Sequence, residues 1–91
     1  MSIIIKKKND DVFIVTVSRN TSTIHQVIVS DDIHLKLTDN LITKEVLVKY
    51  SFEFLLDREP NTSILRSFEI SEISRYFSEY EDKVNSWCYE L

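Results

Sequence analysis

The chain has 91 residues, with 11 lysines and arginines against 15 aspartates and glutamates, one cysteine and no glycine. This length allows one domain over 1–91, and a single cysteine excludes an internal disulfide, so we expect a cytoplasmic protein in a reducing compartment. Without glycine, the chain cannot contain a Walker phosphate-binding loop, a dinucleotide-binding fingerprint or a G-x-S-x-G nucleophile elbow. We identify no secretory signal and no apolar run of roughly 18 residues, so we expect no membrane partner.

The first third of the chain predicts three strands that pair as an antiparallel meander. Residues 12–18 and 23–29 are rich in β-branched side chains, and residues 3–8 form a shorter strand that ends in lysines. Residues 9–11 and 19–22 supply tight connections, which favour pairing between consecutive strands. The lysines at 6–8 are expected to form a solvated strand end.

Helical periodicity begins at Ser30. This residue is a good N-cap for a short helix that runs to about Leu37, and Thr43 can cap a second helix that runs to about Asp57. The apolar side chains of the second helix fill an arc of roughly 200°, so we expect it to form the centre of the core. Turns that need a positive φ must use Asn or Asp. The candidates are Asn9-Asp10, Asn20, Asp39-Asn40 and Asn61.

The last third of the chain predicts a break, a short helical turn and a final helix. Pro60 ends the preceding helical region, residues 61–68 are expected to form the short turn, and Ser71 is expected to cap the final helix. Ser78 and Glu81 have the spacing of a capping box, which leaves open whether the final helix breaks near Ser78. The predicted apolar stripe consists of Ile73, Tyr76, Phe77, Tyr80, Val84, Trp87, Cys88 and Leu91.

Several stretches resemble a group of short uncharacterised bacterial proteins of similar length. The stretches are Ser51-Phe-Glu-Phe-Leu-Leu-Asp-Arg-Glu-Pro60, Ser63-Ile-Leu-Arg66, Ile73-Ser-Arg-Tyr-Phe77 and His25-Gln-Val-Ile-Val-Ser30. The resemblance covers most of the chain and implies a small bacterial protein. Because the group has no established activity, the resemblance supplies no catalytic residue.

A more local pattern resembles the ribbon-helix-helix plan of DNA-binding repressors and antitoxins. The corresponding units would be the strand at 23–29 and the helices at 31–37 and 43–57. In that family the strand pairs with its twin from a second chain and reads base edges in the major groove. Here a hairpin precedes the strand, and neither of its faces contains arginine or lysine, the commonest base-reading side chains. The net charge of −4 also argues against broad phosphate binding.

No catalytic or metal-binding constellation stands out. His25, His34 and Cys88 are the soft metal ligands, and no two of them have a chelating spacing, so we predict no metal, no cofactor and no enzymatic activity. We expect His25 at the sheet margin, His34 exposed on its short helix and Cys88 as a small buried hydrophobe. The acidic pairs are explained by helix starts and solvated helix faces, and no small-molecule substrate is inferred.

The strongest functional signal is a surplus of apolar sheet surface. If Phe13, Val15, Val17, Val27 and Val29 point inward, the opposite face carries Ile4, Val12, Ile14, Ile24, Gln26 and Ile28. An exposed apolar face of this kind usually marks an interface, unless the last helix wraps around and covers it.

We therefore predict an α+β fold: a three-stranded antiparallel meander at 1–30, then three or four helices at 31–91 packed on one face. The predicted function is a non-enzymatic interaction module that forms a homodimer or another homo-oligomer, or binds another protein. The alternative is a ribbon-helix-helix-like DNA-binding regulator or antitoxin.

Overall fold

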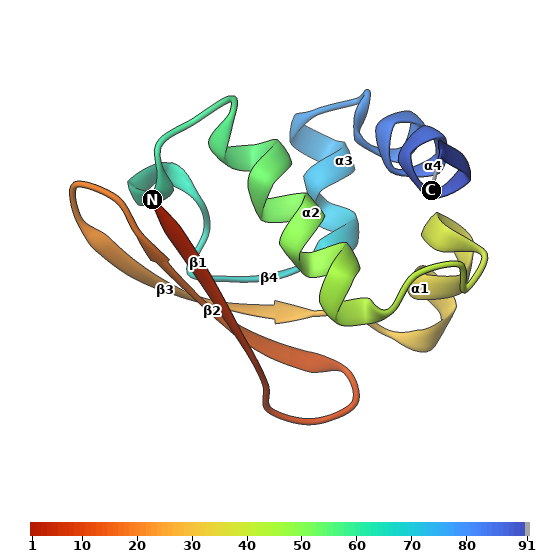
Figure 1. The fold of residues 1–91 in the computed structure, drawn as a ribbon, viewed down its shortest axis with the longest axis horizontal. Coiled ribbons are helices and arrows are strands. Elements are labelled where there is room, and N and C mark those ends of the chain that lie inside the picture. Colours follow the sequence, from red (N-terminus) through yellow and green to blue (C-terminus); the bar gives the residue numbers. More distant parts are fainter. Residues whose placement is uncertain (91) are drawn as a thin grey trace.

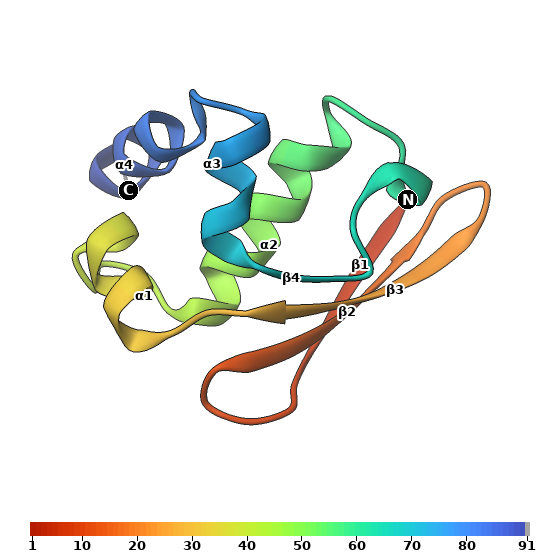
Figure 2. The ribbon, with the colours of Figure 1, turned by 180° about the vertical axis from the view of Figure 1, so that it is seen from behind.

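Three antiparallel strands and one short parallel strand form the sheet of this computed structural model, which describes residues 1–90 (Figure 1). The first three strands pair in sequence order, as the meander prediction required, and β4 extends the sheet in the order β1-β2-β3-β4. The helices lie on one side of this sheet (Figures 1 and 2). The strands are β1 (Ser2–Lys7), β2 (Val12–Ser18), β3 (Ser22–Ile28) and β4 (Ser67–Glu69). The α+β prediction is confirmed, with a mixed rather than a purely antiparallel sheet.

The parallel strand β4 corrects the expectation of a helical turn over 61–68. Only η1 (Asn61–Ser63) is helical there, as one 3₁₀ turn, and the chain then extends to pair β4 with β3. The backbone N–H of Gln26 donates to the carbonyl of Arg66 at 2.8 Å, one residue before β4 begins. Phe68 is buried opposite Val27, and this tertiary contact, rather than local propensity, selects the extended conformation.

The first two helices have the predicted caps. They are α1 (Asp31–Thr38) and α2 (Lys44–Leu56); Ser30 Oγ accepts from Ile33 N–H at 3.3 Å and Thr43 Oγ1 from Val46 N–H at 3.2 Å. The connection between the helices uses positive φ angles of 53° and 59°. Within residues 1–90, Asp39 and Asn40 are the residues with positive φ, so the other predicted Asn and Asp positions turn without it.

The final helix is interrupted at the position that the sequence left open. After the 3₁₀ turn η2 (Ile70–Glu72), α3 (Ile73–Tyr76) ends, residues 77–79 are non-helical, and α4 (Tyr80–Glu90) begins. Ser71 lies inside η2 and does not cap a helix, which corrects that prediction. The interruption turns Tyr76 out of the predicted apolar stripe, and its side chain is 69% exposed. Leu91, the last member of that stripe, lies outside the described residues.

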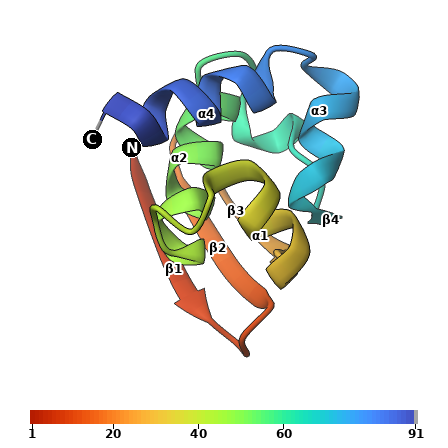
Figure 3. The same ribbon diagram turned by 90° about the vertical axis from the view of Figure 1, so that its right-hand side faces the viewer.

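Helix α2 supplies the centre of the core, as its wide apolar arc predicted. In Figure 3 it lies against the strands, and its buried apolar side chains join those of the inner sheet face in one cluster. The contributors from α2 are Leu47, Val48, Phe52, Phe54, Leu55 and Leu56, and those from the strands are Phe13, Val15, Val17, Val27 and Phe68. Within the part of the chain that the structure describes, no helix is long and apolar enough to cross a membrane.

One buried hydrogen-bond chain ties α4 to α2. Ser51 Oγ donates its single hydrogen to the Leu47 carbonyl at 2.7 Å, so the hydroxyl of Tyr80, 2.5 Å away, must donate to Ser51. Both side chains are fully buried. Burial raises the pKa of the Tyr80 phenol, which keeps its proton available for this bond.

This geometry predicts an asymmetric double-mutant cycle. Ser51→Ala leaves the buried Tyr80 hydroxyl without an acceptor, so we expect it to lower the free energy of unfolding by about 1–3 kcal/mol. Adding Tyr80→Phe removes the orphaned hydroxyl, so we expect the double variant to be as stable as Ser51→Ala or more stable. Urea denaturation followed by circular dichroism measures all of these values. If the losses of stability measured for Ser51→Ala and for Tyr80→Phe simply added in the double variant, the predicted hydrogen bond would be contradicted.

Candidate functional site

The outer face of the sheet is the side that points away from the helices. Strand register places its side chains in four rows: Ser2-Ser18-Ser22, Ile4-Thr16-Ile24, Lys6-Ile14-Gln26-Ser67 and Val12-Ile28-Glu69. All six sequence-predicted interface residues therefore lie on this face. Ile4 is 52% exposed and Ile24 is 59% exposed, while Val12, Ile14, Gln26 and Ile28 are half-buried among their neighbours. No buried residue within 1–90 belongs to these rows, because the helices cover the opposite side.

The β1 edge of the sheet has no strand beside it within residues 1–90. Lys8 N–H donates to the Val12 carbonyl at 2.9 Å, and strand alternation then directs the backbone groups of Ile3, Ile5 and Lys7 away from β2. The lysines at the end of β1 discourage uncontrolled pairing at this edge.

Strand β3 has neighbours on both sides, unlike the strand of a ribbon-helix-helix protein. It pairs with β2 along its length and with β4 over Gln26–Ile28. The pairing of residues 23–29 with a twin strand, which the DNA-binding alternative requires, would have to displace β4 from Gln26–Ile28. The sequence predicted that β2 occupies one edge of β3, and the structure adds β4 on the second edge over Gln26–Ile28.

A groove opens on the helical side, around the segment that links α2 to α3. Its cavity measures about 330 Å³, within the range of small binding pockets. The apolar lining is formed by Leu55, Ile64, Leu65, Phe68, Ile73 and Phe77. Two carboxylates, Glu59 and Glu72, and the ring of Tyr76 also line it. In Figure 2, α3 and the chain leading into β4 lie toward the viewer on this side.

Sequence reasoning missed this groove because its residues come from five separate elements. Tyr76 was expected in the apolar stripe of the final helix, yet it is 69% exposed, and Leu65 is 45% exposed. The one sequence feature that could have indicated the groove is Glu59, a carboxylate between the apolar end of α2 and Pro60. Burial raises the pKa of this carboxyl.

His25 lies in the core and not at the sheet margin, which corrects the sequence expectation. Its Nδ1 lies 2.8 Å from the Leu65 carbonyl, which can only accept, so Nδ1 carries the hydrogen. Its Nε2, 2.8 Å from Thr23 Oγ1, then accepts from that hydroxyl, which itself accepts from Asn61 Nδ2 at 3.0 Å. These hydrogen bonds engage both ring nitrogens of a neutral imidazole, and they connect the segment between α2 and β4 to β3.

His34 and Cys88, the other two candidate metal ligands, also have positions explained by the fold. His34 is half-buried rather than fully exposed, and its Nε2 donates to the Ile42 carbonyl at 2.6 Å. Cys88 is buried, as predicted, and burial raises the pKa of its thiol, which disfavours the reactive thiolate. Over residues 1–90, no group of three or more His, Cys, Asp or Glu side chains is arranged to hold a metal ion.

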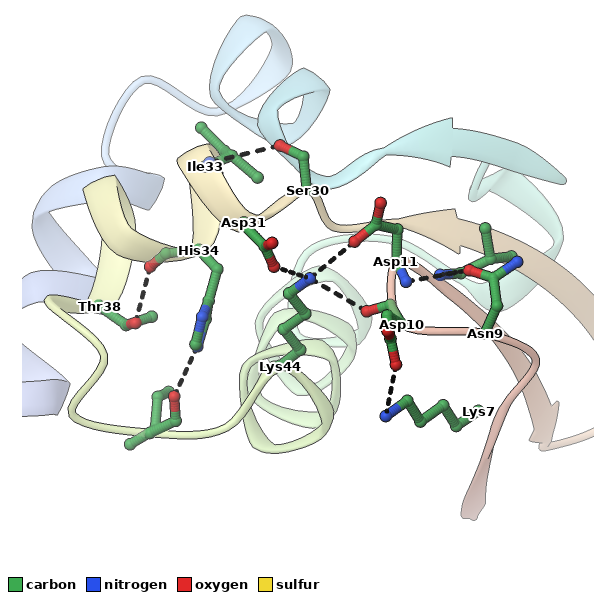
Figure 4. A network of polar contacts seen from close by, with 12 residues as sticks. Lys7, Asn9, Asp10, Asp11, Ser30, Asp31, Ile33, His34, Thr38 and Lys44 are labelled. Atoms are coloured by element: carbon green, nitrogen blue, oxygen red, sulfur yellow. Dashed lines mark hydrogen bonds and ion pairs between the residues drawn. The ribbon is translucent and has the colours of Figure 1, made fainter.

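Lys44 forms a polar junction at the opposite end of α2 from the groove (Figure 4). Its Nζ donates to the Asp10 carbonyl at 3.0 Å, to Asp11 Oδ1 at 2.8 Å and to Asp31 Oδ1 at 2.7 Å. Burial opposes the charge of Lys44, but these hydrogen bonds outweigh it and raise the pKa of the ammonium group. Every acceptor belongs to a neighbouring turn or helix start. We therefore interpret the junction as a structural contact that holds the β1–β2 turn, α1 and α2 together.

Comparisons of the chain with protein-family models, with curated proteins and with solved structures each gave no match. Function is therefore argued from the geometry of the outer face and the groove.

The burial of His25 within a chain of hydrogen bonds predicts a loss of stability under mildly acidic conditions. Burial, followed by the charge of Arg66, lowers the pKa of His25 below its ordinary value of 6.5, although the bond to Leu65 acts in the opposite direction. As the pH falls below 6.5, the unfolded chain therefore takes up this proton first, and the free energy of unfolding declines until the pH passes the folded-state pKa. Each unit of pKa difference corresponds to about 1.4 kcal/mol.

His25→Asn should remove this part of the pH dependence, since its amide does not titrate. We expect the variant to be less stable at neutral pH, with a flatter profile of unfolding free energy below pH 6.5. Urea denaturation across a pH series measures the profile. His34→Asn is the matched control and should retain the decline; an unchanged profile in His25→Asn would contradict the assignment.

Proposed function

We propose that the protein is a non-enzymatic interaction module that self-associates through the outer face of its sheet. The observation that carries this proposal is the set of aliphatic side chains on the outer face, which no helix within 1–90 covers. Contiguous apolar surface rimmed by polar residues is typical of protein–protein contacts. Two such faces can stack as in a β-sandwich, at about 10 Å separation and with aligned strands.

The energetics limit such a dimer to moderate affinity. Complete burial of one Val or Ile side chain contributes about 1.5–3 kcal/mol. Roughly half of that remains available to Ile4 and Ile24, and about a third or less to Val12, Ile14 and Ile28, which are already mostly buried. The aliphatic residues of two copies then contribute at most about 6–12 kcal/mol, against an association cost of about 4–15 kcal/mol. These residues are Ile4, Val12, Ile14, Ile24 and Ile28. We therefore expect an equilibrium that depends on protein concentration.

Charge complementarity supports a second copy as the occupant. The outer face carries Lys6 on β1 and Glu69 on β4, at opposite edges of the sheet. A two-fold axis parallel to the strands would place β1 of each copy over β4 of the other. That arrangement brings the cationic edge of one face to the anionic edge of its partner and aligns the aliphatic rows between them. A bacterial origin and a cytoplasmic location remain predictions of this proposal.

Substitution of Ile24 should weaken the dimer without unfolding the protein. Ile24 is 59% exposed, so Ile24→Glu introduces a charge on the outer face while the core stays intact. We expect its dimer dissociation constant to rise at least about tenfold, measured by sedimentation equilibrium over a concentration series. Ile24→Thr, which keeps the strand preference of a β-branched residue, should give a smaller rise in the same direction.

Leu41→Glu is the matched control for this experiment. Leu41 is also an exposed aliphatic residue, at 52%, but it lies in the connection between α1 and α2. We expect this variant to dimerise like the wild type. A wild-type protein that stays monomeric at millimolar concentration, or equal effects of Ile24→Glu and Leu41→Glu, would refute self-association through this face.

A further inference from the structure

The groove combines an apolar floor with carboxylates that have no cationic partner. Among residues 1–90, neither Glu59 nor Glu72 forms a salt bridge. Glu72 accepts one backbone hydrogen bond, from Glu69 N–H at 3.0 Å, and retains acceptor capacity. Glu59 is half-buried at the same groove. A carboxylate that loses solvation without gaining a cation raises the energy of the empty site, and a bound cation would relieve it.

The nearest arginine in sequence does not neutralise Glu59. Arg58 turns back onto α2, where its guanidinium carbon lies 3.6 Å from the ring centroid of Phe54 and its Nη1 donates to the Phe54 carbonyl at 2.9 Å. These two contacts hold the cation over an aromatic face of the core. The residues that line the groove include two carboxylates and no lysine or arginine.

The rim of the groove offers contacts suited to an extended chain with apolar side chains. Leu65 and Tyr76 line the cavity and are largely exposed, so they present apolar surface beyond the floor. The ring of Tyr76 can also receive a cation over its face. A small molecule needs 70–90% of its surface enclosed, and at about 330 Å³ the cavity is at the lower end for such ligands. A single side chain of a bound polypeptide, inserted into the cavity, is enclosed to this extent more readily than a whole small molecule.

We propose that the groove between α2, β4 and α3 binds a segment of another polypeptide in which a lysine or arginine adjoins apolar residues. The basic group would pair with Glu59 and approach Glu72, while its apolar neighbours cover Leu65, Phe68 and Tyr76. The groove lies on the helical side, opposite the outer face, so this binding is independent of the proposed self-association.

Selection from a random dodecapeptide library tests the proposal with a defined probe. We expect the immobilised wild-type protein to enrich peptides that carry Lys or Arg next to apolar residues. The affinity of an enriched peptide, measured by fluorescence anisotropy, should fall about 10- to 100-fold for Glu59→Gln, because a charge-assisted hydrogen bond is lost. Glu53→Gln, an exposed carboxylate on α2 that does not line the groove, is the matched control and should bind like the wild type.

A second pair of variants tests the apolar component. Leu65→Ala should weaken the same peptide several-fold, whereas Leu41→Ala, at a similarly exposed site outside the groove, should not. Replacement of the peptide's basic residue by glutamate should abolish binding. The proposal is overturned if no peptide is enriched, if acidic or uncharged peptides are enriched, or if Glu59→Gln binds as well as Glu53→Gln.

Two further outcomes would assign the groove to another occupant and equally overturn the proposal. Hexylammonium binding at Glu59 by nuclear magnetic resonance titration, with no enriched peptide, would indicate a small organic cation. Weaker self-association in Glu59→Gln would indicate a second copy of this chain. Because Ile24→Glu tests the outer face by sedimentation and peptide enrichment tests the groove, failure of one proposal leaves the other testable.

Discussion

Burial of the inner sheet face against α2 is the contact on which the rest of the structure depends. A helix that is apolar over more than half its circumference must touch several neighbours, and α2 meets the sheet on one side and the C-terminal helices on the other. Because the helices of residues 1–90 all pack on the inner side of the sheet, they leave its outer face without cover.

The buried polar chain through His25 organises the second half of the fold. Asn61 Nδ2 donates both to Thr21 O, at 2.7 Å, and to Thr23 Oγ1, while His25 donates to Leu65 O. These bonds hold the middle and the C-terminal end of the irregular segment between α2 and β4 against β3 and the turn that precedes it. The segment in turn supplies Glu59, Ile64 and Leu65 to the groove. A polar network in the sheet therefore positions an apolar site on the helical side, and its complete satisfaction explains how a histidine is tolerated in the core.

Local signals were sufficient for the elements that are stabilised locally. Ser30 and Thr43 cap helices as predicted because their hydrogen bonds span only three residues. Strand alternation placed Ile4, Ile14 and Ile24 on one face because the period of a strand is fixed. The prediction failed where distant contacts decide the conformation. The three residues of β4 are too few for a periodic pattern, and the position of His25 depends on partners up to 40 residues away. The groove could not be predicted either, because it exists only after these contacts form.

The two candidate surfaces differ in shape and in charge, and this difference favours different partners. The outer face is a sheet surface with aliphatic rows between a cationic edge and an anionic edge, so it is complementary to itself under a two-fold rotation. The groove is concave and lined by carboxylates. Two grooves that faced each other would therefore be complementary neither in shape nor in charge. Self-association is therefore consistent with the outer face but not with pairing between two grooves. A basic and apolar segment matches the groove in both respects, which is why we assign the two surfaces to different partners.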